Sequence, residues 1–214
     1  MNMTARSAGR PWLQSSSEEP LVGNYFVAVY PPFSCWEVAH IPALERALHE
    51  PSTGAPLGLY VHVPFCHKKC DYCYYLSYVG QTTDVVDRYL ETVLNELALY
   101  AQRPAVAGRP VAFVYFGGGT PSLLTSSQVR RLGEGLQSAL PWDRVEEVTF
   151  ECAPRSVRPE FLEALREIGV TRGSMGVQSF DNTLLKLNGR IHLAEDAVRA
   201  FHLIEQAGFD SVNL

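Results

Sequence analysis

Beyond residue 56, short apolar runs alternate regularly with longer segments in which apolar residues recur at helical spacing. The runs at 57–63 and 111–116 are the clearest strands, and the second is apolar throughout, as expected of a buried parallel strand. Between them, residues 84–100 carry apolar side chains at the spacing of one helix face. Repeated strand–helix units with short loops predict a parallel sheet with helices outside it. In such folds the chemistry lies at the carboxyl ends of the strands.

The same alternation continues along the rest of the chain. A helix is expected to begin at Thr125, where Gln128 completes a capping box. Another is expected near Pro159, and Gly169 marks its end. The remaining expected elements are a helix at 193–206 and strands at 145–151, 174–177 and 209–214.

Residues 1–56 are expected to form an N-terminal extension, and residues 57–214 the main domain. The first 20 residues are polar, which favours disorder. The rest of the extension is expected to hold a strand or packed segment at 21–30, a short helix at 42–50 and a linker at 51–56.

Composition narrows the function classes. Five cysteines, three of them within eight positions, indicate metal or redox chemistry rather than a disulfide framework in a cytoplasmic chain. The net charge of -5 gives no electrostatic argument for nucleic acid as a partner. No apolar run reaches the roughly 18 residues of a membrane span, and residues 1–17 lack the apolar core of a signal peptide. We therefore expect a cytoplasmic protein without a membrane span.

Cys66, Cys70 and Cys73 directly follow the first expected strand, with the spacing C-x3-C-x2-C. Three thiolates on one tight loop are able to hold three irons of a cubane cluster and leave the fourth iron open to another ligand. An open position distinguishes a catalytic metal centre from a closed structural one. A structural zinc site is the alternative, with His62 or His67 as the fourth ligand.

This cysteine spacing, with Tyr72 before the last cysteine, resembles the signature of the radical S-adenosylmethionine (SAM) superfamily. Residues 59–73 also resemble the oxygen-independent coproporphyrinogen III oxidase family and its relatives. The resemblance implies a 4Fe-4S cluster on the three cysteines, with SAM chelating the open iron. In that family the reduced cluster passes one electron to the sulfonium of SAM and releases methionine and a 5′-deoxyadenosyl radical.

Further motifs carry the same resemblance and imply contacts with SAM. In the glycine-rich segment 116–122, it assigns Gly118, Gly119 and Thr120 to the amino group of the methionine part. The plainer interpretation of this segment is a tight turn. Glu151, at the end of a strand, is assigned a contact with SAM.

The segment 172–180 also matches the family, and its Gln178 is expected to hydrogen-bond the nucleoside part of SAM. Arg190 matches an arginine that contacts the carboxylate of SAM, although a surface charge at a helix end is the plainer interpretation. Tyr60 is assigned a place near the sulfonium, or else a role as core filler, and Tyr72 a place near the adenine.

Other residues of these motifs have structural interpretations. Cys152, where relatives often have asparagine, is expected to be a small apolar filler rather than a cluster ligand. Arg172 has a possible role as a structural partner inside the barrel.

The chain also departs from the family in two informative ways. The oxidases have a further cysteine shortly after the cluster motif, and this chain has Tyr74 and Tyr75 there, which favours a relative over the oxidase proper. The chain ends at Leu214, after four complete strand–helix units and part of a fifth, whereas the family core has six strands. The expected fold is therefore α/β, a partial TIM-type (β/α)6 radical SAM barrel from a truncated chain that lacks its C-terminal strands and substrate domain.

The expected function is that of a radical SAM enzyme, an oxidoreductase or methyltransferase acting on a porphyrin-like or natural-product small molecule. Its electron donor would be a protein such as flavodoxin or ferredoxin. A heme chaperone of the same family is the alternative, and a structural zinc protein is a further one. No catalytic residue beyond the cofactor contacts is assigned.

Overall fold

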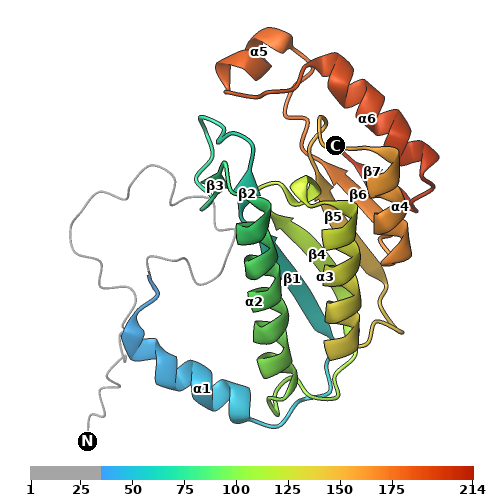
Figure 1. Ribbon diagram of the computed structural model, residues 1–214. Helices are drawn as coiled ribbons and strands as arrows, with labels where there is room; N and C mark the ends of the chain where they lie inside the picture. Colours follow the sequence, from blue (N-terminus) through green and yellow to red (C-terminus); the bar gives the residue numbers. More distant parts are fainter. Residues whose placement is uncertain (1–34) are drawn as a thin grey trace, which may run out of the picture. The chain divides into compact units, whose positions relative to one another are not determined.

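The computed structural model describes residues 35–214 (Figure 1). Contacts divide the chain between Ala47 and Leu48 into two units, each described by itself. In the first unit a 3-10 helix spans Val38–His40, and α1 (Ile41–His49) begins there and ends in the second unit, which confirms the expected short helix. The expectations for 1–20 and 21–30 lie outside the described residues. The assignment of 1–56 to an extension stays a prediction.

A parallel sheet forms the centre of the second unit. Its strands follow one another in chain order, as β1-β4-β5-β6-β7, and every neighbouring pair is parallel. Within the described part of the chain, β1 and β7 are the two edges of this sheet. The strands are β1 (Leu57–Val63), β4 (Val111–Gly118), β5 (Glu147–Cys152), β6 (Arg172–Met175) and β7 (Ser211–Asn213).

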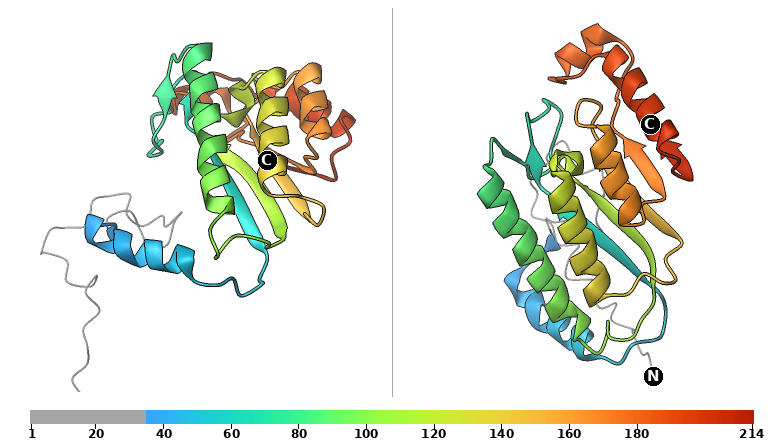
Figure 2. Two further views of the ribbon diagram at one scale, coloured as in Figure 1. Left: turned by 60° about the horizontal axis from the view of Figure 1, so that its bottom comes forward. Right: turned by 45° about the vertical axis from the view of Figure 1, so that its right-hand side comes forward.

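Helices connect successive strands and cover one face of the sheet. In Figures 1 and 2, α2, α3 and α4 lie side by side over that face. The helices are α2 (Thr83–Ala101), α3 (Ser126–Ala139), α4 (Pro159–Glu167), α5 (Asn182–Leu187) and α6 (Ala194–Gln206). The fold is thus α/β with a parallel sheet, as expected. None of the helices among residues 35–214 is long and apolar enough to cross a membrane.

Alternate residues of each strand face the helices and form the core. Phe116 of β4 and Phe150 of β5 are almost completely buried, with ring centroids 4.9 Å apart. Phe150 also meets Phe161 of α4 edge to face. Because side chains alternate along a strand, the residues between these core positions face the other side of the sheet. That second face carries Tyr60, Tyr115 and other polar groups, and it leads up to the site described below.

Local sequence signals placed most of these elements correctly. Thr125 caps α3, and its hydroxyl accepts from the Gln128 backbone N–H while the Gln128 side chain accepts from the Thr125 N–H. Gly169 follows α4 with a φ of +84°, as a helix-ending glycine does.

The fourth main strand was expected at 174–177, which was wrong by two residues, since β6 is Arg172–Met175. After Met175 the chain leaves the sheet in two tight turns. Short segments were not expected at all: α5, the 3-10 helix Pro121–Leu123, and the parallel pair β2 (Phe65–Cys66) and β3 (Tyr78–Val79).

Candidate functional site

A pocket of about 630 Å³ lies at the carboxyl ends of the main strands. It is lined by the ends of β4, β5, β6 and β7, by the cysteine loop that follows β1, and by the segments on either side of α5. Of the site residues expected from the sequence, the following line it: Cys66, Cys70, Tyr72, Cys73, Gly118, Gly119, Thr120, Glu151, Gln178 and Arg190. Residues spread over more than half of the chain therefore meet at one cavity.

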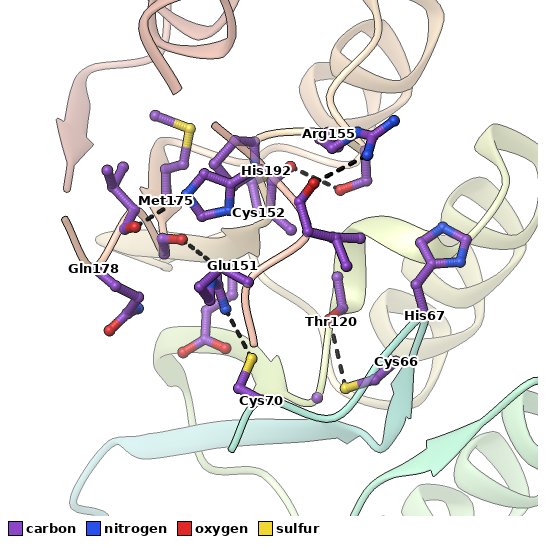
Figure 3. Close-up of a pocket in the computed structure, with 18 of the residues that line it drawn as sticks. Cys66, His67, Cys70, Thr120, Glu151, Cys152, Arg155, Met175, Gln178 and His192 are labelled. Carbon is purple, nitrogen blue, oxygen red and sulfur yellow. Dashed lines mark hydrogen bonds between the residues drawn. The ribbon is translucent and has the colours of Figure 1, made fainter. Parts of the chain in front are cut away.

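The cysteine loop presents three free, partly buried thiols to this pocket. Cys66 ends β2. Cys70 and Cys73 lie at the two ends of a turn, which is closed by a 3.1 Å hydrogen bond from the Cys73 N–H to the Cys70 carbonyl. Two of the sulfurs accept hydrogen bonds, Cys66 Sγ from the Thr120 hydroxyl at 3.6 Å and Cys70 Sγ from the Arg190 guanidinium at 3.2 Å (Figure 3).

The thiols are not gathered around one point. Among residues 35–214, no group of three or more His, Cys, Asp or Glu side chains is close enough to hold a single metal ion. A cubane cluster takes each thiolate on a different iron, so its ligands need not converge as those of one zinc ion must. Three free thiols on one loop are a donor set that suits a 4Fe-4S cluster with an open fourth iron.

The glycine-rich loop packs against the chain itself. A Cβ on Gly118, whose φ is +116°, would lie 2.7 Å from the His62 ring. A Cβ on Gly119 would lie 2.7 Å from the Phe65 carbonyl oxygen and 3.0 Å from Cys66 Sγ. Gly119 thus lets the end of β4 approach the backbone that leads into the cysteine loop, whereas the space beside Gly118 is filled by the His62 ring.

Glu151 is the next-to-last residue of β5, and its carboxylate is largely buried at the pocket. One carboxylate oxygen accepts from the Tyr115 hydroxyl at 2.7 Å, and the other from the Gly118 N–H at 3.2 Å. Burial raises the pKa of Glu151 above its ordinary value, and these two hydrogen bonds, together with His62, oppose that rise. The carboxylate is therefore held in one place while part of it stays available to the pocket (Figure 3).

Gln178 is the one non-glycine residue with a positive φ, +70°, among those that the structure describes. It is the central residue of a three-residue turn in which the Ser179 N–H donates to the Val177 carbonyl. A similar turn, in which the Val177 N–H donates to the Met175 carbonyl, directly precedes it. A strained backbone of this kind persists only where the surroundings enforce it, and such positions cluster at binding sites. His192, 2% exposed, supplies part of that enforcement by donating from Nε2 to the Val177 carbonyl at 3.0 Å.

Arg190 follows α5 and reaches across the pocket. Its guanidinium donates to Cys70 Sγ through Nη1 and to the Gly176 carbonyl through Nη2, at 3.2 and 2.5 Å. Its Nε is buried without a hydrogen-bond partner among the described residues. Arg190 is thus not a simple surface charge at a helix end.

Tyr60 is the expected site residue that the structure does not bring to the pocket lining. It is half exposed on the second face of the sheet, its hydroxyl lies 2.9 Å from His62 Nδ1, and its ring stacks on that of Tyr115. Burial of the ring and the nearby Glu151 raise the pKa of Tyr60 to about 12. Its assignment near the sulfonium stays a prediction.

Two residues at the site, Tyr115 and His192, were not predicted from the sequence. Tyr115 stands in the apolar run 111–116, where a phenol needs a partner for its hydroxyl, and that need was the available signal. No local pattern marked His192.

Two residues have the surroundings that the sequence suggested. Cys152 is buried, and burial raises the pKa of its thiol to about 12, which suits an inert filler. Arg172 pairs with Glu147 at 3.3 Å on the second face of the sheet.

The sequence of this chain is similar to those of known proteins. The sequence profile of the Radical SAM superfamily matches residues 60–214. The heme chaperone HemW of Escherichia coli is 39% identical over 162 residues, which cover 74% of this chain and 42% of that protein. The oxygen-independent coproporphyrinogen III oxidase of Synechocystis is 37% identical over 160 residues, which cover 74% of this chain and 34% of that protein.

A solved structure also matches. The coproporphyrinogen III oxidase (HemN) of Escherichia coli, described as a radical SAM enzyme, matches with a TM-score of 0.71 and 34% sequence identity. The match covers 80% of this chain and 39% of that one. The chain therefore spans between 34% and 42% of the length of the two relatives named above.

Proposed function

Because this chain belongs to the radical SAM superfamily, we propose that it binds a 4Fe-4S cluster through Cys66, Cys70 and Cys73 and cleaves SAM reductively. Members of the superfamily use this cluster and SAM. The observation that carries the proposal is the pocket itself, where three free thiols of one loop face the ends of four parallel strands. When bound, the cluster would supply the electron that cleaves SAM into methionine and a 5′-deoxyadenosyl radical.

The residues of the pocket suit the groups that SAM carries. The Glu151 carboxylate is an acceptor for an ammonium group, and Tyr115 and Gly118 hold it in place. The unpartnered Nε of Arg190 is a donor that a carboxylate would satisfy, and a buried donor gains most from such a partner. Gln178 offers an amide to the nucleoside part, and Tyr72, half exposed at the rim, offers a ring to the adenine.

The reaction on the second substrate is proposed more coarsely. We propose an oxidoreductase or methyltransferase that acts on a porphyrin-like or natural-product small molecule, with a flavodoxin or ferredoxin as electron donor. The similarity to coproporphyrinogen oxidases supports the substrate class.

A heme chaperone is the second candidate. Two observations favour it: the 39% identity to a protein of that name, and the presence of Tyr74 and Tyr75 where the oxidases have a further cysteine. Such a chain would keep the cluster and deliver heme.

The first experiment is anaerobic reconstitution of the chain with iron and sulfide, followed by dithionite and SAM. We expect 5′-deoxyadenosine to form, and each of Cys66→Ala, Cys70→Ala and Cys73→Ala to reduce it to background. Cys35→Ala is the matched control, since Cys35 is also a free, partly buried thiol but lies outside the loop and the pocket. It should retain the parental rate.

Other results would redirect the assignment. A cluster-loaded chain that makes no 5′-deoxyadenosine and binds heme in a spectral titration would favour the chaperone. Stoichiometric zinc and no iron after the same treatment would mean that the cluster proposal is wrong.

A further inference from the structure

The segment Asn188–Arg190, which directly follows α5, contacts the cysteine loop through each of its three residues. The Asn188 carbonyl accepts from the Asp71 N–H at 3.2 Å. Gly189, with a φ of +70°, lies against the Asp71 carboxylate so closely that a Cβ there would be 2.8 Å from Oδ1. Arg190 then donates to Cys70 Sγ. All these contacts fall on Cys70 and Asp71, at the middle of the cysteine motif.

The contacting segment is itself fixed at both ends. Capping by Asp181 orders the start of α5, since its carboxylate accepts from the Thr183 and Leu184 N–H groups. At the other end, Arg190 is tied to the strand side of the pocket through the Gly176 carbonyl. A loop with little secondary structure of its own is thereby attached to an ordered part of the fold.

We propose that Asn188–Arg190 is a clasp that positions the cysteine loop, and that Arg190 hydrogen-bonds the sulfur of Cys70 while that sulfur is bound to the cluster. The second half of this proposal rests on the proposed function, whereas the first half concerns the chain alone. A hydrogen bond from a cation to a cluster sulfur favours the reduced, more negative cluster, so it raises the reduction potential. Arg190 is in this respect a positioning residue as well as a predicted SAM ligand.

The test compares two arginines that line the same pocket. Arg190→Gln removes the cationic donor to Cys70, whereas Arg155→Gln removes an equal charge from a side chain that donates to the Ile191 carbonyl. Hydrogen exchange of the peptide covering 67–73 is measured on the full chain before reconstitution. We expect Arg190→Gln to speed exchange in this peptide several-fold and Arg155→Gln to leave it near the parental rate. Parental exchange in Arg190→Gln would overturn the clasp.

The second part of the proposal, the hydrogen bond from Arg190 to cluster-bound Cys70, is tested by the midpoint potential of the reconstituted chain, measured without SAM. We expect a shift to more negative potential in Arg190→Gln that exceeds the shift in Arg155→Gln. Equal shifts would assign the effect to pocket charge and contradict the hydrogen bond to sulfur. If the parent takes up no cluster, the proposed function fails, and the exchange comparison still decides whether the clasp exists.

A glycine pair repeats the test with both arginines intact. Gly189→Ala and Gly169→Ala place a side chain at similar positive φ values, +70° and +84°, but only the first meets a neighbour, because the space around Gly169 is open. Faster exchange of 67–73 in Gly189→Ala alone supports the clasp. Equal exchange in the two variants would contradict the packing contact at Gly189.

Discussion

At the scale of single residues, the site depends on polar groups that hold one another. Glu151 is the clearest case, since it is largely buried and each of its carboxylate oxygens accepts one hydrogen bond, from Tyr115 or from Gly118. Removing a partner from a buried charge costs more than removing a hydrogen bond between neutral groups. Tyr115 therefore holds in place a carboxylate whose ionised form is disfavoured by burial, which raises the pKa of Glu151.

This role predicts different costs for two tyrosines. Tyr115→Phe should lower the free energy of unfolding by about 1.5–3 kcal/mol at neutral pH, because its acceptor is a carboxylate. Tyr89→Phe should cost about 0.5–1.5 kcal/mol, because the acceptor of Tyr89 is the neutral His62 carbonyl at 2.7 Å. Urea unfolding of the two variants beside the parent makes the comparison. A larger loss in Tyr89→Phe would show that Glu151 does not rely on Tyr115.

At the scale of elements, short polar signals at helix ends and turns direct the chain toward the pocket. The capping box of Thr125 begins α3 just after the glycine-rich loop, and the turns around Gln178 end β6 early. The capping box and the turns both lie next to residues that line the pocket. The local geometry that begins a helix or ends a strand therefore also positions side chains at the cavity.

The capping box gives a prediction for α3. Thr125→Ala should cost about 1 kcal/mol, since it leaves the Gln128 N–H without its cap. The matched control is Ser138→Ala, because Ser138 lies in the last turn of the same helix and its hydroxyl bonds back to the Glu134 carbonyl. Ser138→Ala should leave the free energy of unfolding unchanged or raise it slightly, since alanine is the better helix former. Chemical unfolding measures both, and equal losses would contradict the cap.

At the scale of the whole molecule, the sheet divides its residues between two environments. One face packs on helices and is apolar, and the other carries titratable groups such as Glu147 and Glu151. Glu151 has a pKa raised by burial, whereas the hydrogen bond from Thr149, followed by Arg172, lowers the pKa of Glu147. The two carboxyls therefore act on the stability of the fold with opposite pH dependence.

Proton linkage gives the direction in which each carboxyl changes the stability of the fold with pH. A carboxyl with a raised folded pKa binds its proton more tightly when folded, so its stabilisation is complete below its unfolded pKa near 4.5 and is lost as pH rises through the folded pKa. As pH falls from neutral to 4.5, the parent should therefore gain stability relative to Glu151→Gln.

Glu147→Gln is the control variant, and Glu147 affects the pH dependence of stability in the opposite direction. The depressed folded pKa of Glu147 stabilises above its unfolded pKa, and that stability is lost as pH falls through the folded pKa. The parent should thus lose stability relative to Glu147→Gln when the pH is taken below 4.5. Unfolding curves at a series of pH values check both, and slopes of the same sign would contradict this account.

The sequence by itself determined the order and type of the long elements, because strands and helices differ in the period of their apolar residues. The pattern at 57–63 predicted β1 residue for residue, and Thr125 with Gln128 predicted the start of α3. The cysteine motif was equally clear, because its residues are neighbours in the chain and any fold must keep them together. The family resemblance added the positions of Gly118, Glu151, Gln178 and Arg190, which do line one pocket.

Only the tertiary structure decided which groups touch. Tyr115 meets Glu151 across 36 positions of sequence, and Arg190 meets Cys70 across 120. His62 and the start of the cysteine loop fill the space beside Gly118 and Gly119, and Tyr60 does not line the pocket. Such contacts depend on strand register and on how loops pack, which are set by many distant interactions at once and leave no periodic trace in the local sequence.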